Sequence, residues 1–142
     1  MTEQSNFDPQ PTEAGLQLAV EAGNEFFEPG LTRLELGQDG QVLVTNQLEG
    51  KQQQFEGQVD AELAASLIGQ VRSSDALMNP ELGQRTGLPD EPRYHFEVYR
   101  NDQRLLSRNI WRSELEEYPD LEKLLVVLQD ITSRFSDGEI IL

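Results

Sequence analysis

The chain has 142 residues, the usual size of one domain, and no cysteine, which excludes disulfide bonds, thiolate metal ligands and cysteine nucleophiles. Its 26 acidic and 11 basic residues give a formal net charge of -15 at pH 7, which disfavours binding to nucleic acid and to anionic membranes. With 37% hydrophobic residues the chain can still bury a core, and we expect a soluble, acidic, cytoplasmic protein.

Residues 1–15 are polar, contain Pro9 and Pro11 and show no hydrophobic period, which predicts a disordered tail. They have neither the basic region nor the apolar region of a secretory signal. The longest apolar run, residues 124–128, is far shorter than the about 20 residues that span a bilayer. Residues 16–142 are therefore expected to form a single domain.

Alternating apolar residues predict strands in the first half of this domain. Residues 16–20 alternate and predict a short strand, although they also fit a helical turn, and Glu-Pro-Gly at residues 28–30 is expected to end it. A hairpin is predicted for residues 31–47, around an Asp-Gly pair that suits a tight turn. A second turn leads into a polar edge strand that ends near Phe55, whose glutamines and lysine are expected to discourage pairing with another sheet.

Two amphipathic helices and a second hairpin are predicted after this point. Asp60 suits the N-cap of the first helix, Gly69 suggests close packing along it, and Pro119 suits the first turn of the second helix, within residues 113–135. The expected buried stripes are Leu63, Leu67, Ile68 and Val71 in the first helix and Leu121, Leu124, Leu125, Leu128 and Ile131 in the second. Between the helices, residues 93–111 alternate on both sides of an Asn-Asp turn.

This order of elements predicts an α+β fold, a two-layer sandwich in which two helices pack on one face of an antiparallel sheet. We expect about five strands, in the order strand, strand, strand, helix, strand, strand, helix. An additional strand at the N-terminus is also possible. Tyr94, Phe96 and Val98 would share one face of their strand, and His95, Glu97 and Tyr99 the other.

The sequence contains no motif that indicates catalysis. His95 is the only histidine, so a histidine-based metal cluster is excluded, and a surface position on its strand explains this residue better than a catalytic one. There is no phosphate-binding glycine loop and no nucleophile elbow. We therefore predict no catalytic, metal-binding or cofactor-binding residue and no enzymatic activity; hydrolysis through His95 with Glu97 is the least favoured hypothesis.

A long irregular segment precedes the second hairpin and ends in an acidic loop at residues 87–92. Long loops in compact domains are often functional, and exposed aromatic residues on a sheet face often bind partners. The candidate interaction surface is therefore Asp90, Glu91, Arg93, Tyr99 and Trp111. Connection between two elements also explains the loop, and residues 16–30 or the C-terminal residues 139–142 could cover the aromatic residues.

A Pro-Asp pair before a tyrosine that opens an alternating strand, followed by Pro-x-Leu-x-x-Leu-Leu in a final helix, resembles the emfourin-type proteins. The matching residues are Pro89, Asp90, Tyr94, Pro119, Leu121, Leu124 and Leu125. The resemblance covers the second half of the chain and implies a small α+β fold and inhibition of thermolysin-like zinc metallopeptidases. It supports the fold more than the function, because most of these positions are turn or core positions.

The leading hypothesis is a non-enzymatic protein-interaction domain, in one version a binder that resembles protease inhibitors. Its partner would be another protein, with no nucleic acid, membrane or cofactor involved, and the chain itself would be a monomer or a weak homodimer. The alternative is a small-ligand-binding domain with a pocket between sheet and helices, lined by Tyr94, Trp111 and Leu128.

Overall fold

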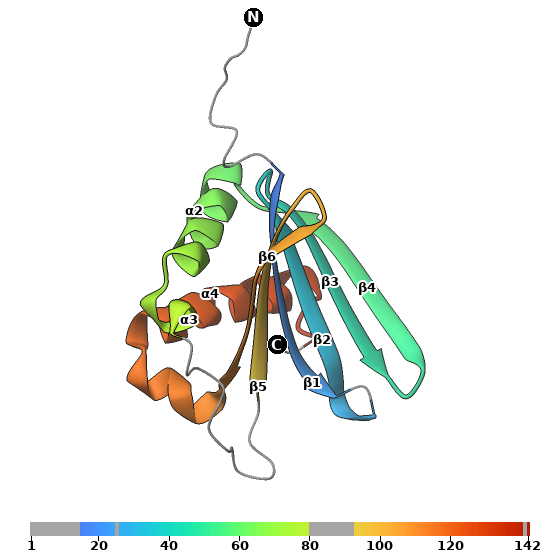
Figure 1. Cartoon of the computed structure of the whole chain (residues 1–142). Helices are drawn as coiled ribbons and strands as arrows, with labels where there is room; N and C mark the ends of the chain where they lie inside the picture. The colour runs from blue at the N-terminus through green and yellow to red at the C-terminus, as the bar shows by residue number, and fades with distance from the viewer. Residues whose placement is uncertain (1–14, 25, 80–92, 141) are drawn as a thin grey trace, which may run out of the picture.

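A computed structural model describes residues 15–24, 26–79, 93–140 and 142 of the chain. These residues form an α+β fold with a six-stranded antiparallel sheet, in the order β4-β3-β2-β1-β5-β6 (Figure 1). The strands are β1 (Leu16–Asn24), β2 (Phe27–Gly37), β3 (Gln41–Leu48), β4 (Lys51–Gln58), β5 (Arg93–Arg100) and β6 (Gln103–Trp111). The helices are α2 (Ala61–Arg72), α3 (Asp75–Met78), the 3-10 helix η1 (Arg112–Glu117) and α4 (Pro119–Phe135).

Two hairpin turns follow the predicted pattern. Glu49 and Gly50 have φ angles of 53° and 80°, and Asn101 and Asp102 have φ angles of 47° and 71°. Two successive residues with positive φ form the turn whose twist matches that of paired strands, which explains why these residues connect β3 to β4 and β5 to β6. The turn predicted around Asp39 and Gly40 joins β2 to β3.

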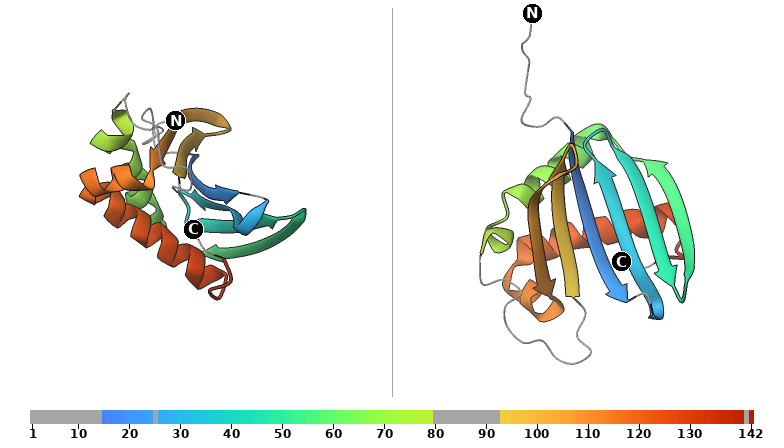
Figure 2. Two further views of the ribbon diagram at one scale, coloured as in Figure 1. Left: turned by 90° about the horizontal axis from the view of Figure 1, so that it is seen from below. Right: turned by 45° about the vertical axis from the view of Figure 1, so that its right-hand side comes forward.

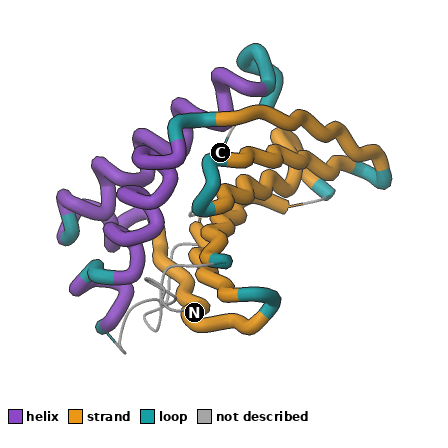
Figure 3. The backbone as a smooth tube through the Cα atoms, turned by 90° about the horizontal axis from the view of Figure 1, so that it is seen from above, coloured by secondary structure: helices purple, strands orange, loops and turns teal. Residues whose placement is uncertain are grey.

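The described helices all lie on one side of the curved sheet, which we call the inner face (Figure 3). In Figure 2, right, α4 (red) crosses behind the strands from β6 towards β4. In the same view α2 (green) lies at the upper left of the sheet. Alternate residues of the strands and the apolar stripes of α2 and α4 form one hydrophobic core between the sheet and the helices. Its fully buried large side chains include Leu18, Leu34, Leu36, Ile68, Phe96, Ile110, Leu125, Leu128 and Ile131.

The helix ends follow the predicted chemistry in most respects. The carboxylate of Asp60 accepts the backbone N–H of Glu62 at 2.8 Å and caps α2, and Pro119 is in the first turn of α4. The end of α4 reaches the edge of the sheet, where a side chain at Gly57 would collide with the ring of Phe135. Gly57 is therefore the residue that allows α4 to pack closely against β4.

The structure corrects several expectations. The sheet has six strands rather than about five, because the possible additional strand at the N-terminus is present as β1. The Glu-Pro-Gly sequence lies within β2 and does not end a strand. The expected second helix is divided into η1 and α4, and α3 is a further short helix. Gly69 is exposed with no neighbour that a side chain would meet, so the expected close packing there was wrong, and Leu63 is partly exposed.

Ile140 and Leu142, near the C-terminus, join the core. Ile140 is 2% exposed, and the backbone oxygen of Leu142 accepts a hydrogen bond from Gln129 on α4 at 3.1 Å. They therefore lie on the helix side and do not cover the opposite face. In the part of the chain that the structure describes, no helix has the length and hydropathy of a membrane span. The tail expected at residues 1–15 lies, apart from Gly15, outside the described residues.

Candidate functional site

The second face of the sheet, which we call the outer face, has none of the described helices against it (Figure 3). Because side chains alternate between the faces of a strand, this face carries the residues that lie between the core positions. They are mostly polar or charged. Its central part, from β2 across β1 to β6, holds Gln17, Ala19, Glu21, Arg33, Glu35, His95, Glu97, Tyr99, Arg104, Ser107, Asn109 and Trp111.

Arg33 on β2 is the centre of a charged network on the outer face. Its Nε donates to Glu35 at 3.0 Å and its Nη1 donates to Glu97 at 3.2 Å, and Nη1 also lies 3.5 Å from Glu21. Glu97 in turn lies 3.7 Å from Nη1 of Arg104 on β6. The network therefore connects four strands, β2, β1, β5 and β6, although Arg33 and Glu97 are 64 positions apart in the sequence.

The bridge from Arg33 to Glu97 passes over Ala19, the residue of β1 that pairs with both Glu35 and Glu97. Ala19 is only 1% exposed although it points to the outer face. Because Arg33 bonds to both Glu35 and Glu97, the two neighbours of Ala19 in the sheet, we infer that a small side chain at this position leaves room for the guanidinium group. A larger side chain at this position would occupy the space that the bridge needs.

Burial and hydrogen bonding oppose each other in this network, and hydrogen bonding prevails. For Glu97, burial raises the pKa, whereas hydrogen bonds from Tyr99 and Arg33 and the charge of His95 lower it. The lowering effects are larger together, so the pKa of Glu97 lies below its ordinary value. For Arg33, burial lowers the pKa, and the hydrogen bonds and charges of Glu35 and Glu97 raise it above its ordinary value. Both groups are therefore held in their charged forms.

His95 lies beside this network with partners at both ring nitrogens. Its Nδ1 is 2.8 Å from Oδ1 of Asn109, and its Nε2 is 3.1 Å from Oγ of Ser107 and 3.4 Å from Oε2 of Glu97. A serine, a histidine and an asparagine in this order resemble the nucleophile, base and orienting residue of a catalytic triad. Sequence spacing alone would not have brought them together, because Ser107 and Asn109 come from the neighbouring strand.

The chemistry of these partners does not favour a catalytic base. A base would need a free lone pair on Nε2, and that lone pair would face the carboxylate of Glu97, which can only accept hydrogen bonds. A ring that donates from Nε2 to Glu97 has no lone pair at this nitrogen to take a proton from Ser107. The arrangement therefore orders the sheet surface more readily than it activates the serine hydroxyl.

Aromatic and cationic residues border the polar network on β5 and β6. Arg93 pairs directly with Trp111, and its guanidinium carbon lies 5.6 Å from the centre of the indole ring. Tyr99 lies at the other end of β5, opposite Arg104 on β6. Figure 1 shows these two strands at the end of the sheet that is farthest from β4.

The structure places three of the five residues of the predicted interaction surface on one face of the sheet, but only Arg93 and Trp111 are in contact, because Tyr99 lies at the other end of β5. Arg93, Tyr99 and Trp111 lie on the outer face of β5 and β6, whereas Asp90 and Glu91 lie outside the described residues. The three residues expected to line a ligand pocket do not meet. Tyr94 and Leu128 are buried in the core beneath the inner face, while Trp111 lies on the outer face.

Sequence reasoning missed the residues that organise this face. Arg33 and Glu35 alternate with the buried Leu34 and Leu36, so their outward direction was available from the pattern. Their contact with Glu97 could not be predicted from the pattern, because pairing of β1 with β5 joins segments that are distant in sequence. Ala19 carried no visible signal, since an alanine in a strand usually only fills space.

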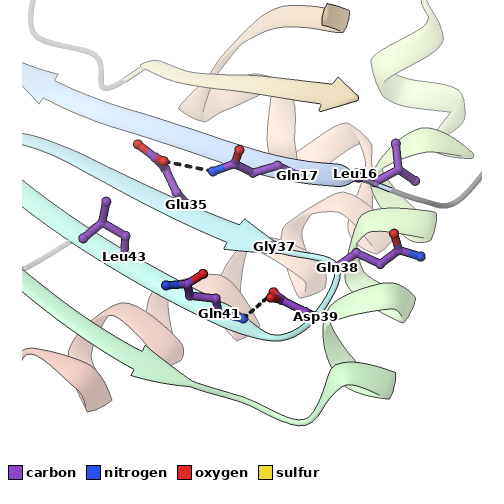
Figure 4. Close-up of a pocket in the computed structure, with 9 residues that line it drawn as sticks. Leu16, Gln17, Glu35, Gly37, Gln38, Asp39, Gln41 and Leu43 are labelled. Carbon is purple, nitrogen blue, oxygen red and sulfur yellow. Dashed lines mark hydrogen bonds between the residues drawn. The ribbon is translucent and has the colours of Figure 1, made fainter. Parts of the chain in front are cut away.

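A shallow hollow of about 590 Å³ lies on the outer face where β1, β2 and β3 meet the turn after β2. Figure 4 shows its lining, with the amide of Gln17 bonded to Glu35 at 2.9 Å and the carboxylate of Asp39 accepting the backbone N–H of Gln41 at 3.0 Å. The hollow is open to solvent, and its lining is divided about equally between polar groups and apolar groups, the latter including Leu16 and Leu43. Among the described residues, no group of three or more histidine, cysteine or acidic residues could hold a metal ion.

Two comparisons of the sequence with known proteins assign no role to this site. No protein-family model matches the chain. No curated protein sequence matches it significantly. The resemblance to emfourin-type proteins therefore stays a prediction, and the function is argued from the geometry.

Proposed function

We propose that the chain is a non-enzymatic protein-interaction domain that binds its partner through the outer face of β5 and β6. We call this surface the β5–β6 outer face and define it by Arg93, His95, Glu97, Tyr99, Arg104, Ser107, Asn109 and Trp111. The observation that carries the proposal is that the described helices cover only the inner face, while the outer face presents a tryptophan stacked with an arginine.

The composition of this surface supports a protein partner. Tryptophan, tyrosine and arginine are the residues that most often dominate binding energy in protein interfaces, because each combines a large apolar area with polar groups. Trp111 and Tyr99 are half-buried by their neighbours, so little side-chain freedom remains to be lost on binding. The charged network beside them connects β2, β1, β5 and β6.

Charge suggests what the partner presents. Arg100 and Arg108 pair with core positions of the inner face, so the β5–β6 outer face carries Arg93, Arg104 and Glu97, a net charge of +1 in a chain whose net charge is -15. Arg104 is well exposed, with 60% of its side chain accessible, and Arg93 and Arg112 are also exposed. Arginine binds carboxylates in a two-pronged geometry, so a partner surface with carboxylate groups fits this part of the sheet.

The experiment is affinity capture of partners from the source cell, followed by binding measurements with the purified partner. We expect the double variant Arg93→Ala/Trp111→Ala to lose at least about tenfold in affinity, which corresponds to about 1.4 kcal/mol. The matched control is Val126→Ala/Val127→Ala, two exposed residues of α4 on the opposite side of the molecule. Equal affinity of both variants would overturn the proposed surface.

The acidic loop at residues 87–92 remains part of the proposal, since it leads directly into Arg93. Asp90→Ala/Glu91→Ala tests it in the same capture experiment. A reduced affinity in this variant would extend the binding surface beyond the sheet, and an unchanged affinity would confine the surface to the sheet.

A narrower version is that the partner is a thermolysin-like zinc metallopeptidase, and it rests on the resemblance of residues 89–125 alone. Titration of thermolysin with the purified chain tests it directly. Inhibition that Arg93→Ala/Trp111→Ala weakens would support this version. Full peptidase activity at a large molar excess of the chain would remove it and leave the broader proposal in place.

A second candidate is a small polar ligand bound in the hollow beside Asp39, because its volume lies within the range of known ligand sites. A screen of polar metabolites by thermal unfolding tests this candidate. A ligand that raises the melting temperature of the wild type but not of Gln17→Ala would support it. A stabilising effect that persists in Gln17→Ala would place the ligand elsewhere.

A further inference from the structure

The two edges of the sheet differ in their protection against pairing with another strand. The ladder between β5 and β6 is interrupted between Val98 and Tyr99, where Leu105 is the extra residue. Bulges and charged side chains are the usual devices that keep an edge strand from pairing, and β6 has this bulge together with Arg104 and Arg108. Its end also continues directly into η1. The β6 edge is therefore guarded.

The β4 edge has no bulge, and its only charged residues are Lys51 and Glu56. Its ladder with β3 runs without interruption over eight residue pairs, from Gln41 with Gln58 to Leu48 with Lys51. It contains no proline, and its only cation is Lys51, the first residue of the strand. The expectation that glutamine and lysine discourage pairing stays a prediction, and two features of the edge speak against it: glutamine amides can hydrogen-bond to another strand, and the lysine is the first residue of β4.

The second side of β4 is open in the part of the chain that the structure describes. The six residues of β4 other than Phe55 and Gly57 are exposed. The described backbone hydrogen bonds of residues 51–57 all belong to the sheet, where β4 pairs with β3 alone. Every second backbone N–H and C=O group along this edge is thus available to a further strand.

We propose that β4 is a self-association edge, along which two copies of this chain pair antiparallel and extend their sheets into one. A two-fold axis perpendicular to the sheet would relate the copies and place their helices on the same side. This inference is independent of the proposed function, since β4 and the β5–β6 outer face lie at opposite ends of the sheet.

Charge favours a second copy as the occupant. β4 contains one lysine and one glutamate, so it is a neutral edge in a chain of net charge -15. Its Gln52, Gln53 and Gln54 both donate and accept hydrogen bonds, so the edge is complementary to itself. An antiparallel pairing centred on Gln54 would place Lys51 opposite Gly57 of the second copy, and no like charges would face each other.

Repulsion between two acidic molecules opposes this pairing, so association should strengthen as salt screens the remaining surface. Sedimentation of the full chain over a range of concentrations, at low and high salt, measures this. We expect a dimer that forms more readily at high salt. A chain that stays monomeric at every concentration and salt level would overturn the proposal and would favour a strand from another protein as the occupant of this edge.

A matched pair of variants locates the contact. Gln52→Glu/Gln54→Glu would place like charges opposite each other across the two-fold axis, and it should weaken dimerisation at least about tenfold relative to the control. The control, Gln41→Glu/Gln47→Glu, adds the same charge to exposed positions of the outer face of β3. Equal weakening by both variants would reduce the effect to overall charge and overturn the assignment to β4.

The absence of cysteine in the sequence permits a second, independent test. Residues at the centre of an antiparallel self-pairing lie within disulfide distance of their own copies, about 4.5 to 5.5 Å between Cα atoms. Under mild oxidation, Gln54→Cys or Gln53→Cys should therefore give a disulfide-linked dimer, and the more efficient of the two identifies the central residue. Cross-linking by the control Gln41→Cys to the same extent would contradict the pairing.

Discussion

The inner and outer faces of the same sheet are held together by different forces. Beneath the inner face, Leu34, Phe96 and Leu128 are fully buried, and the energy comes from apolar area removed from water. On the outer face, Arg33 and Glu97 supply hydrogen bonds between charged groups that remain partly accessible. The comparison teaches that the core determines whether this chain folds, while the charged network determines how its outer surface is arranged.

The core should give the largest effect in any test of this comparison. We expect Leu128→Ala to lower the free energy of unfolding by about 2–5 kcal/mol, because it removes a fully buried side chain and leaves a cavity. The matched control is Val127→Ala, the adjacent and partly exposed residue of α4, for which we expect less than about 1 kcal/mol. Urea denaturation measures both. Similar losses for the two variants would contradict the assignment of the inner face.

Removal of the central carboxylate of the outer face should have an intermediate effect. Glu97→Gln keeps the shape of the side chain but removes the charge that Arg33 and Arg104 approach, and we expect a loss of about 1–3 kcal/mol. The control is Glu56→Gln, an exposed carboxylate on β4, with an expected change near zero. If both variants unfold at the same urea concentration, the network is only a surface feature.

The response to pH sharpens the same test. The pKa of Glu97 lies below its ordinary value, so the unfolded chain binds this proton more readily than the folded chain does. The stability that the carboxylate contributes is then present above the ordinary pKa of about 4.5 and is lost as the pH falls below it. We expect the difference in unfolding free energy between wild type and Glu97→Gln to be constant near neutral pH and to narrow in acid. A difference that widens in acid would reverse the sign of the proposed shift.

The stacked pair at the end of β5 should contribute least to stability. A double-mutant cycle of Arg93→Ala and Trp111→Ala should give a coupling energy of about 0.5–1 kcal/mol, the range for an exposed cation above an aromatic ring. Binding of a partner through the β5–β6 outer face would depend on the same pair more strongly than folding does. Equal effects on folding and on affinity would indicate that the pair acts through the strand rather than through contact with the partner.

Local chemistry was enough to predict most elements of this fold. The turn residues Asn101 and Asp102, the N-cap Asp60 and the alternation of Tyr94 and Phe96 all act within a few positions, and the structure confirms them. The continuation of β2 through Pro29 was missed, because proline and glycine usually end a strand, and here the sheet overrides that preference.

The candidate site was less accessible to prediction, since its residues meet only through pairing of distant strands. His95 and Glu97 were known to share a face, but Arg33 joins them only because β1 lies between β2 and β5. The direction of each side chain follows from alternation, whereas its neighbours follow from the order of strands in the sheet. Asp90 and Glu91 stay predictions, outside the described residues.

The place of β1 in the middle of the sheet has a consequence for synthesis on the ribosome. Residues 16–58 can form a four-stranded meander as soon as they emerge, but Leu18 pairs with Val98, so that one side of β1 stays open until β5 has been made. During that interval a nascent chain presents an unpaired strand with an apolar face, the type of segment that aggregates or recruits chaperones. Translation speed between residues 59 and 92 would therefore influence the yield of folded protein.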